Sequence, residues 1–393
     1  MKRLIAFLFA TLHTFLSQAQ HSLLWKFSTG SAVYSSPVIS GDNIYFGSSD
    51  MNLYAVRKNS GELIWKYTTK GQVNSSPAIQ DNKVLFSSTD GNIYALDRNK
   101  GSLLWTFKTK GEQRYDLWDY YLSSPVIHDG IAYFGSGDST VYAIRVESGK
   151  MVWRYKTNGI VHASPAFKND TLLIGSYDGC FYALGAKTGK LIWKFKTVGD
   201  ANFPKGEVQK AALVHNNTVV FGSRDYNIYA LDIKTGTGNW NMKERGSWVI
   251  ATPFLHNDNI YVGTSDTHRF YCMSLSSGKI KWTLPLNMRV YGTAALMDSS
   301  IVFGCFNGKM YFVDAQSGMI KSTFQTDESK TRYTRLYDND DHFRKDFELY
   351  GKDYIEAEKQ ILSLGAVLSD PLIENHTVYF GDTNGYFYAL QVE

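Results

Sequence analysis

Tryptophan recurs through this chain at intervals close to 40 residues, and each copy ends a similar phrase. The phrase SGELIW at 60–65 returns as KGSLLW at 100–105 and as TGKLIW at 188–193. Successive intervals are 40, 40, 48, 40, 47 and 42 residues, and the members are Trp25, Trp65, Trp105, Trp153, Trp193, Trp240 and Trp282. A period of this length indicates a repeat fold, in which neighbouring units bury each other's apolar faces.

Each repeat reads as four short strands. Within residues 72–109 we expect strands at 73–80, 83–88, 92–97 and 103–108, separated by turns that hold Asp81, Gly91 and Gly101. Aromatic residues make up 15% of the chain, with 26 Tyr and 23 Phe, and this composition favours β-structure. Four antiparallel strands repeated in this way form the blades of a β-propeller.

A landmark residue, usually proline, marks the innermost strand of each repeat. It occurs eight times, as Pro37, Pro77, Pro125, Pro165, Ala212, Pro253, Ala294 and Pro371. The last repeat supplies three strands, whereas the strand at 23–27 belongs to no repeat of its own. We therefore predict an all-β, eight-bladed propeller of four-stranded antiparallel blades, whose N-terminal strand completes the last blade and closes the ring. The predicted single domain spans 20–393, with an inserted loop and helix at about 326–365.

The first 19 residues are of a different kind. Met1-Lys2-Arg3 is positive, 4–16 is mostly apolar, and Ser17-Gln18-Ala19 offers a small-residue cleavage site. This pattern predicts a cleavable signal peptide over 1–19, the alternative being a short anchor that is retained. The cleavage site has no cysteine for lipid attachment. We expect a periplasmic or secreted monomer.

Composition excludes several other classes of protein. Hydrophobic residues make up 44% of the chain and charged residues 20%, which excludes a disordered chain. A net charge of +4 over 393 residues does not favour nucleic-acid binding. No stretch beyond the N-terminal segment approaches the ~18 apolar residues of a transmembrane helix. The three cysteines, at 180, 272 and 305, form no adjacent pair, and we expect them to be small buried apolar residues.

The recurring tryptophans are expected to pack between neighbouring blades. From Trp65 onward, each follows the glycine of its turn by four residues, a constant spacing that indicates a structural role. The seventh blade departs from it, because Ser322 stands four residues after Gly318. We expect Phe324 to substitute there, and this junction to be the weakest.

Extra residues accumulate in the links between blades. Relative to 40, the additions fall at 110–121 and 199–208, and the longest is at about 326–365. Links between blades share one face of a propeller, so this decorated face is the candidate binding face. Within 353–362, Ile355, Lys359 and Leu362 recur at helical spacing and predict a short helix that caps the channel. The candidate binding residues are Arg114, Tyr115, Trp118, Asp119, Trp248, Arg332 and Arg335.

The aromatic residues of the first link have an alternative role, which is to plug the mouth of the channel. Near the axis, the innermost strands carry further polar side chains, either at the Ser-Ser-Pro site itself or three residues before the landmark. They are suited either to orienting a polar ligand or to bonding ordered water. These channel candidates are Asn74, His162, Gln209, Lys210 and Asp370. The recurring aspartates, such as Asp50 and Asp90, are instead interpreted as turn residues that bond their own backbone.

The repeat as a whole resembles the pyrroloquinoline quinone (PQQ) enzyme repeat. Residues 176–193, SYDGCFYALGAKTGKLIW, show the pattern well. The resemblance implies the eight-bladed fold but not a cofactor, because the family includes PQQ-dependent alcohol dehydrogenases and also non-catalytic propellers of the BamB type.

The resemblance leaves three functions open. The first is a non-catalytic envelope scaffold without cofactor, whose partners would be envelope or outer-membrane proteins. The second is an alcohol or sugar dehydrogenase with PQQ and Ca²⁺, for which Asp119, Lys210 and Asp370 are the candidate site residues; the adjacent cysteine pair usual in such enzymes is missing here. The third is recognition of a glycan or a peptide, favoured by the aromatic loop at 114–121.

Overall fold

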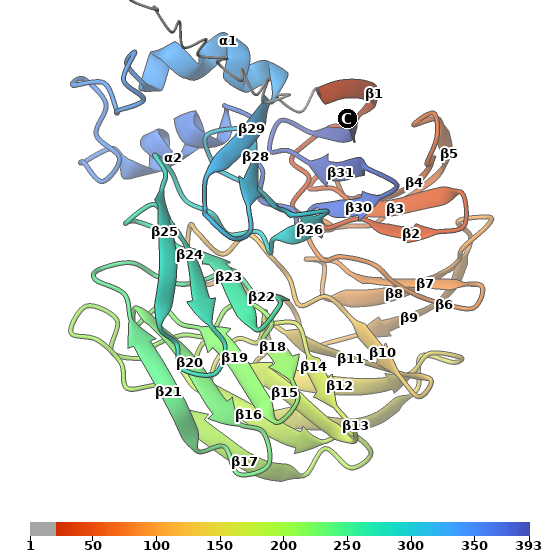
Figure 1. Cartoon of the computed structure of the whole chain (residues 1–393). Helices are drawn as coiled ribbons and strands as arrows, with labels where there is room; N and C mark the ends of the chain where they lie inside the picture. Colours follow the sequence, from red (N-terminus) through yellow and green to blue (C-terminus); the bar gives the residue numbers. More distant parts are fainter. Residues whose placement is uncertain (1–20) are drawn as a thin grey trace, which may run out of the picture.

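The computed structural model describes residues 21–393, so the predicted signal peptide lies outside the described residues. Eight four-stranded antiparallel sheets stand around a common axis (Figure 1). The predicted all-β, eight-bladed propeller is confirmed, and the blades are numbered here from the N-terminus.

The strand boundaries follow the repeat closely. Blades 1 and 2 contain β2 (Val38–Ser40), β3 (Asn43–Gly47), β4 (Asn52–Arg57), β5 (Leu63–Thr68), β6 (Ala78–Gln80), β7 (Lys83–Ser87), β8 (Asn92–Asp97) and β9 (Leu103–Lys108). Blades 3 and 4 contain β10 (Val126–His128), β11 (Ile131–Ser136), β12 (Thr140–Arg145), β13 (Met151–Lys156), β14 (Ala166–Lys168), β15 (Thr171–Gly175), β16 (Cys180–Gly185) and β17 (Leu191–Lys196). Blades 5 and 6 contain β18 (Leu213–His215), β19 (Thr218–Gly222), β20 (Asn227–Asp232), β21 (Gly238–Lys243), β22 (Phe254–His256), β23 (Asn259–Gly263), β24 (Arg269–Ser274) and β25 (Ile280–Pro285). Blades 7 and 8 contain β26 (Ala295–Met297), β27 (Ser300–Gly304), β28 (Lys309–Asp314), β29 (Ile320–Gln325), β30 (Leu372–Glu374), β31 (Thr377–Gly381), β32 (Tyr386–Val392) and β1 (His21–Ser28).

The innermost strand of each blade is shorter than predicted. In blade 2 it begins at Ala78 rather than at residue 73. Over the residues that the shorter strand lacks, a serine side chain replaces the backbone hydrogen bonds between strands. The Ser75 hydroxyl accepts from the Ser87 N–H and donates to the Ser87 carbonyl. The Ser76 N–H bonds to the Ser124 hydroxyl of the next blade. The segment before β6 therefore joins blades instead of extending one.

The ring closes as predicted. The strand β1 pairs antiparallel with β32, from His21 opposite Val392 to Ser28 opposite Tyr386. The two ends of the chain thus share one sheet, and the pairing removes the free edge that an open array of blades would expose.

Seven of the eight junctions between blades use one device. The Trp65 indole donates to the Arg98 carbonyl of the next blade at 3.0 Å and lies against Gly101. Gly101 has a φ of +68°, and a Cβ there would lie 2.6 Å from the indole, so the turn requires glycine. The same pairing recurs at Trp25/Gly61, Trp105/Gly149, Trp153/Gly189, Trp193/Gly236, Trp240/Gly278 and Trp282/Gly318. The structural role predicted for the tryptophans agrees with these contacts.

The junction between blades 7 and 8 is sealed differently. Ser322 is buried, and Phe312 stands opposite it, where Ala55 faces Trp65 in blade 1. His21 packs on Phe312 with ring centroids 4.6 Å apart. Phe324 packs on Phe380 and Tyr388, just as Phe27 packs on Phe46 and Tyr54 in a regular blade. The prediction that Phe324 replaces the tryptophan was therefore wrong, because Phe312 and His21 fill that volume.

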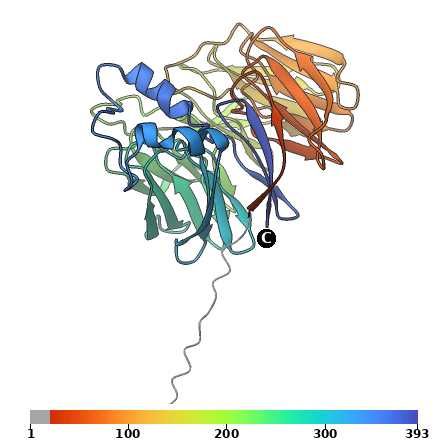
Figure 2. The same cartoon turned by 90° about the horizontal axis from the view of Figure 1, so that it is seen from above.

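The link between blades 7 and 8 folds into two helices, α1 (Asp327–Leu336) and α2 (Tyr354–Leu362), which lie together on one side of the ring (Figure 2). Thr326 caps α1 by accepting from the Ser329 N–H, a helix start that the sequence analysis did not identify. The predicted helix at 353–362 is confirmed, but its predicted face was wrong. Ala357, Glu358 and Ile361 are buried, whereas Ile355 is 49% exposed.

Two further expectations concern the cysteines and the membrane. Cys272 and Cys305 are buried as expected, Cys180 is half-buried, and all three are free thiols. Among residues 21–393, neither helix has the length and apolar character needed to cross a membrane.

Candidate functional site

Three links from different blades meet on one face of the propeller. Trp118, from the 110–121 link, packs edge-on against Trp248 with ring centroids 5.6 Å apart. Phe203, from the 199–208 link, also packs edge-on against Trp248, with ring centroids 5.0 Å apart. Trp118 also stacks on Tyr354 of α2 at 6.0 Å. The extra residues therefore build one composite surface, named here the link face.

A buried carboxylate joins these links. Glu358 of α2 is 2% exposed, and both its oxygens bond to Nη1 of Arg289, at 3.0 and 2.7 Å. It also accepts from the Trp118 indole at 3.2 Å and from the Tyr120 hydroxyl. A buried ion pair is costly to break, because removal of one partner leaves the other charge unpaired. Glu358 thus holds α2 and the 110–121 link in one arrangement.

A second buried arginine organises the same link. Arg224 lies over the Trp248 ring, with Cζ 4.3 Å from the centroid. Its terminal nitrogens bond to Asp116, and its Nε donates to the Gln209 side chain at 3.0 Å. Gln209 in turn donates to the Trp118 carbonyl at 3.1 Å. The guanidinium of Arg224 is therefore fully engaged within the protein.

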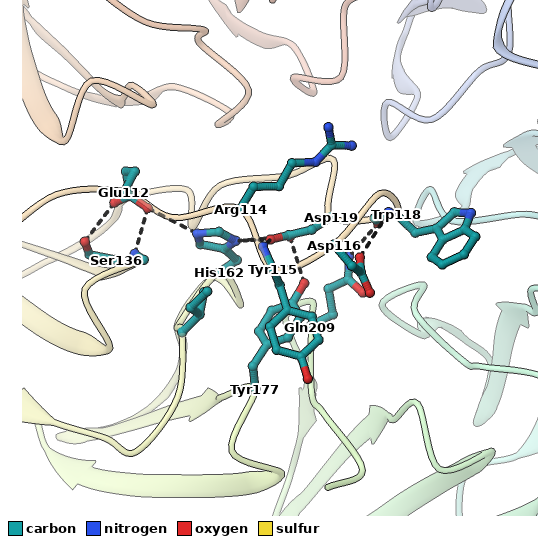
Figure 3. A network of polar contacts seen from close by, with 12 residues as sticks. Glu112, Arg114, Tyr115, Asp116, Trp118, Asp119, Ser136, His162, Tyr177 and Gln209 are labelled. Carbon is teal, nitrogen blue, oxygen red and sulfur yellow. Dashed lines mark hydrogen bonds and ion pairs between the residues drawn. The ribbon is translucent and has the colours of Figure 1, made fainter. Parts of the chain in front are cut away.

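The channel candidate His162 is part of a buried ionic network (Figure 3). Its Nδ1 lies 2.9 Å from Oδ2 of Asp119, and its Nε2 lies 3.1 Å from Oε2 of Glu112. The Tyr177 hydroxyl donates to Asp119 at 2.7 Å. Burial alone lowers the pKa of His162, but the charges and hydrogen bonds of Asp119 and Glu112 outweigh burial and raise it to about 10. The charge of His162 likewise lowers the pKa of Asp119 against the opposing effect of burial.

Side chains of this chain narrow the centre of the ring, where a cavity of about 350 Å³ remains between them. The Tyr121 hydroxyl donates to the Leu368 carbonyl at 2.9 Å. Lys210 lies over the Tyr121 ring, with Nζ 4.1 Å from the centroid, and pairs with Asp370 at 3.3 Å. The plug expected as an alternative role for the first link is therefore formed by its last residues, including Tyr120 and Tyr121.

Two cavities open on the link face. The larger, about 500 Å³, is lined by Tyr115, Asp116, Trp118, Asn202, Phe203, Pro204, Lys205, Glu207, Arg224, Trp248, Ser265, Asp266, Arg289, Tyr291 and Tyr350. A second cavity of about 360 Å³ includes Asn74, Arg114, Asp119 and His162. Of the predicted binding residues, Tyr115, Trp118 and Trp248 thus line the larger cavity, and Arg114 and Asp119 line the second.

The two remaining predicted binding residues lie elsewhere. Arg332 and Arg335 are on α1, where Arg332 pairs with Glu328 at 3.1 Å and Arg335 is exposed. Neither lines either cavity, so the structure does not bring them to the other candidates.

Sequence reasoning missed the buried charges Arg224, Arg289 and Glu358. Arg224 had a detectable signal, because it stands between Ser223 and Asp225 in a phrase where other blades carry residues such as Ser49 or Thr89. Glu358 had none, because its partners lie 69 and 240 residues away.

One cluster with metal-binding residue types lies outside the link face. Within residues 21–393, His128, Asp129 and Asp170 place one ligand atom each within 4.8 Å of the others. They belong to the hairpin turns on the opposite face, and the two aspartates are exposed.

The eight blades and the strand pairing that closes their ring define an eight-bladed propeller of the PQQ-repeat class. The family model described as outer membrane protein assembly factor BamB matches residues 11–159 and 137–247, more than half of the chain. The chain therefore belongs to this family. In sequence, no curated protein matches it.

Solved structures with the same fold include both functional types. BamB from Moraxella catarrhalis superposes with a TM-score of 0.72 at 16% identity, over 95% of this chain and 100% of that protein. A europium-containing methanol dehydrogenase superposes with a TM-score of 0.71 at 14% identity, over 94% and 93%. A quinohemoprotein alcohol dehydrogenase from Comamonas testosteroni gives 0.71 at 13%, over 94% and 76%. At these identities the likeness shows the fold alone.

Proposed function

We propose that this chain is an exported, non-catalytic propeller scaffold that binds other proteins of the cell envelope through its link face. The observation that carries the proposal is the fixed composite surface that Glu358 joins from α2, the 110–121 link and Arg289. A surface held in one conformation loses little entropy when a partner binds.

The same surface exposes the residue types that anchor protein interfaces. Tyr350 is 53% exposed, Tyr354 is 41% exposed and Ile355 is 49% exposed, and all three belong to the 326–365 insertion. Exposed tyrosines beside an aliphatic residue are typical of interaction surfaces. Membership in the BamB family supports envelope proteins, including outer-membrane proteins, as the partners. The scaffold needs no cofactor and acts as a monomer outside the cytoplasm.

The narrowed axis, where a cavity of about 350 Å³ remains, supports a role without a bound quinone. Tyr121 and the Lys210–Asp370 pair occupy the centre of the ring, and Arg224 and Arg289 already pair with carboxylates. The axis and the larger cavity of the link face therefore offer few unpaired cationic groups to an anionic cofactor. We assign no residues to PQQ or Ca²⁺.

Site-specific photo-crosslinking tests the scaffold role. A photoreactive residue placed at Ile355 should give discrete adducts with envelope proteins, which mass spectrometry identifies. The matched control is Ile192 on β17, which is 52% exposed and far from the link face. Equal adducts from both positions, or none from Ile355, contradict the proposal.

Cofactor reconstitution tests the competing dehydrogenase. The purified chain is mixed with PQQ and Ca²⁺, and binding is followed by calorimetry and turnover by alcohol-dependent dye reduction. We expect neither. Tight binding with turnover would overturn the scaffold proposal and redirect attention to Asp119, Lys210 and Asp370.

A further inference from the structure

Three residues that line the larger cavity occupy the same position of the repeat in three successive blades. Glu207, Trp248 and Arg289 each stand directly before a valine, and each backbone carbonyl accepts at 3.0 Å from the next blade-turn N–H. Blades 1, 2, 4 and 8 carry Ala32, Gln72, Ile160 and Ala366 at this position. Blades 5, 6 and 7 thus depart from the repeat together, and they do so where the cavity lies.

Each of these three side chains has a polar atom without a partner. The atoms are Oε2 of Glu207, Nε1 of Trp248 and Nε of Arg289, and none makes a hydrogen bond within the described protein. Nε of Arg289 does have an ionic neighbour, because Oδ1 of Asp266 lies 3.7 Å away. The side chains are only 5%, 7% and 1% exposed. Buried polar groups in native proteins normally have partners, so three such atoms bordering one cavity indicate that a ligand completes them. Together they offer one acceptor and two donors.

Asp266 adds a carboxylate to the lining of the cavity, because it does not make the hydrogen bond that its counterparts make in regular blades. In regular blades the turn aspartate accepts from the tyrosine hydroxyl four residues on, as Asp50 does from Tyr54 at 2.6 Å. In blade 6, Glu244 accepts from Tyr271 instead, at 3.0 Å. Asp266 is thereby freed to line the cavity, where its side chain is 30% exposed and accepts from the Tyr350 hydroxyl.

The charge balance points to a neutral ligand. Arg224 pairs with Asp116, and Arg289 pairs with Glu358. The charged side chains that line the cavity also balance, since the carboxylates of Asp116, Glu207 and Asp266 oppose the cations of Lys205, Arg224 and Arg289. Its free polar atoms both donate and accept. A sugar hydroxyl does both, and the C–H face of a sugar ring packs on aromatic walls such as those of Trp118 and Phe203.

The backbone around the cavity disfavours an extended peptide. None of the described residues lining it belongs to a strand, because all come from links and turns. An extended polypeptide would find no strand edge to pair with there. We propose that this cavity is a binding site for a neutral saccharide unit, an activity beyond the scaffold role.

Three neutral disaccharides serve as probes, namely maltose, cellobiose and N,N′-diacetylchitobiose. Each is mixed with the full mature chain and followed by saturation-transfer NMR and by tryptophan fluorescence. We expect saturation transfer to the ring C–H protons of at least one sugar at about 10 mM, a level suited to millimolar affinity. The tripeptide Gly-Trp-Gly is tested in parallel as a peptide probe.

Two variants locate the site. Trp248→Phe keeps the ring beneath Arg224 but removes the unpartnered N–H, and Glu207→Gln replaces an acceptor with a donor. Each should weaken sugar binding about tenfold, because a hydrogen bond to the ligand is lost. Trp240→Phe, a blade-docking residue whose indole donates to the Leu275 carbonyl, is the matched control and should leave affinity unchanged.

Three results would overturn the proposal. The first is no transfer to any of the sugars. The second is sugar binding that both cavity variants leave intact, which would place the sugar elsewhere. The third is binding of Gly-Trp-Gly alone, with the same sensitivity to both variants, which would make the cavity a peptide site. None of these outcomes depends on whether Ile355 crosslinks to a protein, so the two proposals fail separately.

Discussion

The blade junctions and the link face are held together by opposite means. At each regular junction an indole packs on a glycine and donates one hydrogen bond to a backbone carbonyl, over 2.6 to 3.2 Å. The link face is instead held by buried charges, among them Arg224, Arg289, Glu358, Asp119 and His162.

The difference separates two kinds of stability in one molecule. Apolar packing between blades depends little on pH or salt. It repeats because each regular junction buries the same residue types in the same geometry. Buried ion pairs are sensitive to protonation and fix one arrangement of loops, because each charge needs its partner. Substitutions in the two regions should therefore differ in how the loss of stability depends on pH.

The largest effect is expected at a regular junction. Trp193→Ala removes an indole that packs on Gly236 and donates to the Ile233 carbonyl at 2.7 Å. The free energy of unfolding should fall by about 3–5 kcal/mol, with no marked pH dependence. Urea unfolding measures it, and Leu191→Ala, at a 43% exposed position on the same strand, is the control. A loss as small as the control's would mean that the junction is not sealed by the indole.

A pH-dependent loss is expected at His162. His162→Gln should destabilise the protein by about 3 kcal/mol near pH 6, because Asp119 is left as a buried unpaired charge. The pKa of His162 is raised from 6.5 to about 10, so its stabilisation is complete below pH 6.5 and is lost as the pH rises through 10.

Thermal unfolding of wild type and variant across this pH range checks the prediction. The gap in Tm should narrow steadily above neutral pH. A constant gap would show that His162 contributes through packing rather than charge. His215, in a hairpin of the opposite face, provides the control substitution.

A local loosening is expected at Glu358. Glu358→Gln keeps the shape of the side chain but leaves Arg289 with the carboxylate of Asp266, 3.7 Å away, as its remaining counter-charge, which should cost about 2 kcal/mol. Hydrogen exchange should accelerate in α2 and in the 110–121 link, while blades 1 and 2 stay protected. Glu356→Gln, at an exposed position of the same helix, should change neither. Faster exchange spread over every blade would contradict a local role.

The smallest effect is expected at the closing junction. Ser322→Trp restores the usual residue but competes with Phe312 and His21 for one volume, and such overpacking should cost about 1–2 kcal/mol. Adding Phe312→Ala and His21→Gly recreates a regular junction and should recover most of that loss. A double-mutant cycle by urea unfolding measures the coupling. Additive losses would mean that these residues do not share the space.

Several features were predictable because they are local and repeated. The Gly-x-x-x-Trp phrase, the turn aspartates and the eight landmarks each specify structure within one blade, so strand number and ring closure followed from spacing. The junction between blades 7 and 8 also had a signal in the sequence that the prediction overlooked. Phe312 stands where the other blades have Ala or Cys. The innermost strands were predicted too long, because serine hydroxyls replace their ladder bonds in a way that residue type alone does not reveal.

The site was predicted in part for the same reason. Link lengths identified the decorated face, and Trp118 and Trp248 stood out from the repeat. The amino-acid sequence by itself therefore determined the ring, its closure and the face on which loops gather, since these depend on contacts within a blade or with the next one. Only the tertiary structure decided that Glu358 meets Trp118 and Arg289, that Lys210 pairs with Asp370 near the axis, and that Glu207, Trp248 and Arg289 border one cavity. Those contacts join residues that are remote along the chain, and no repeated pattern specifies them.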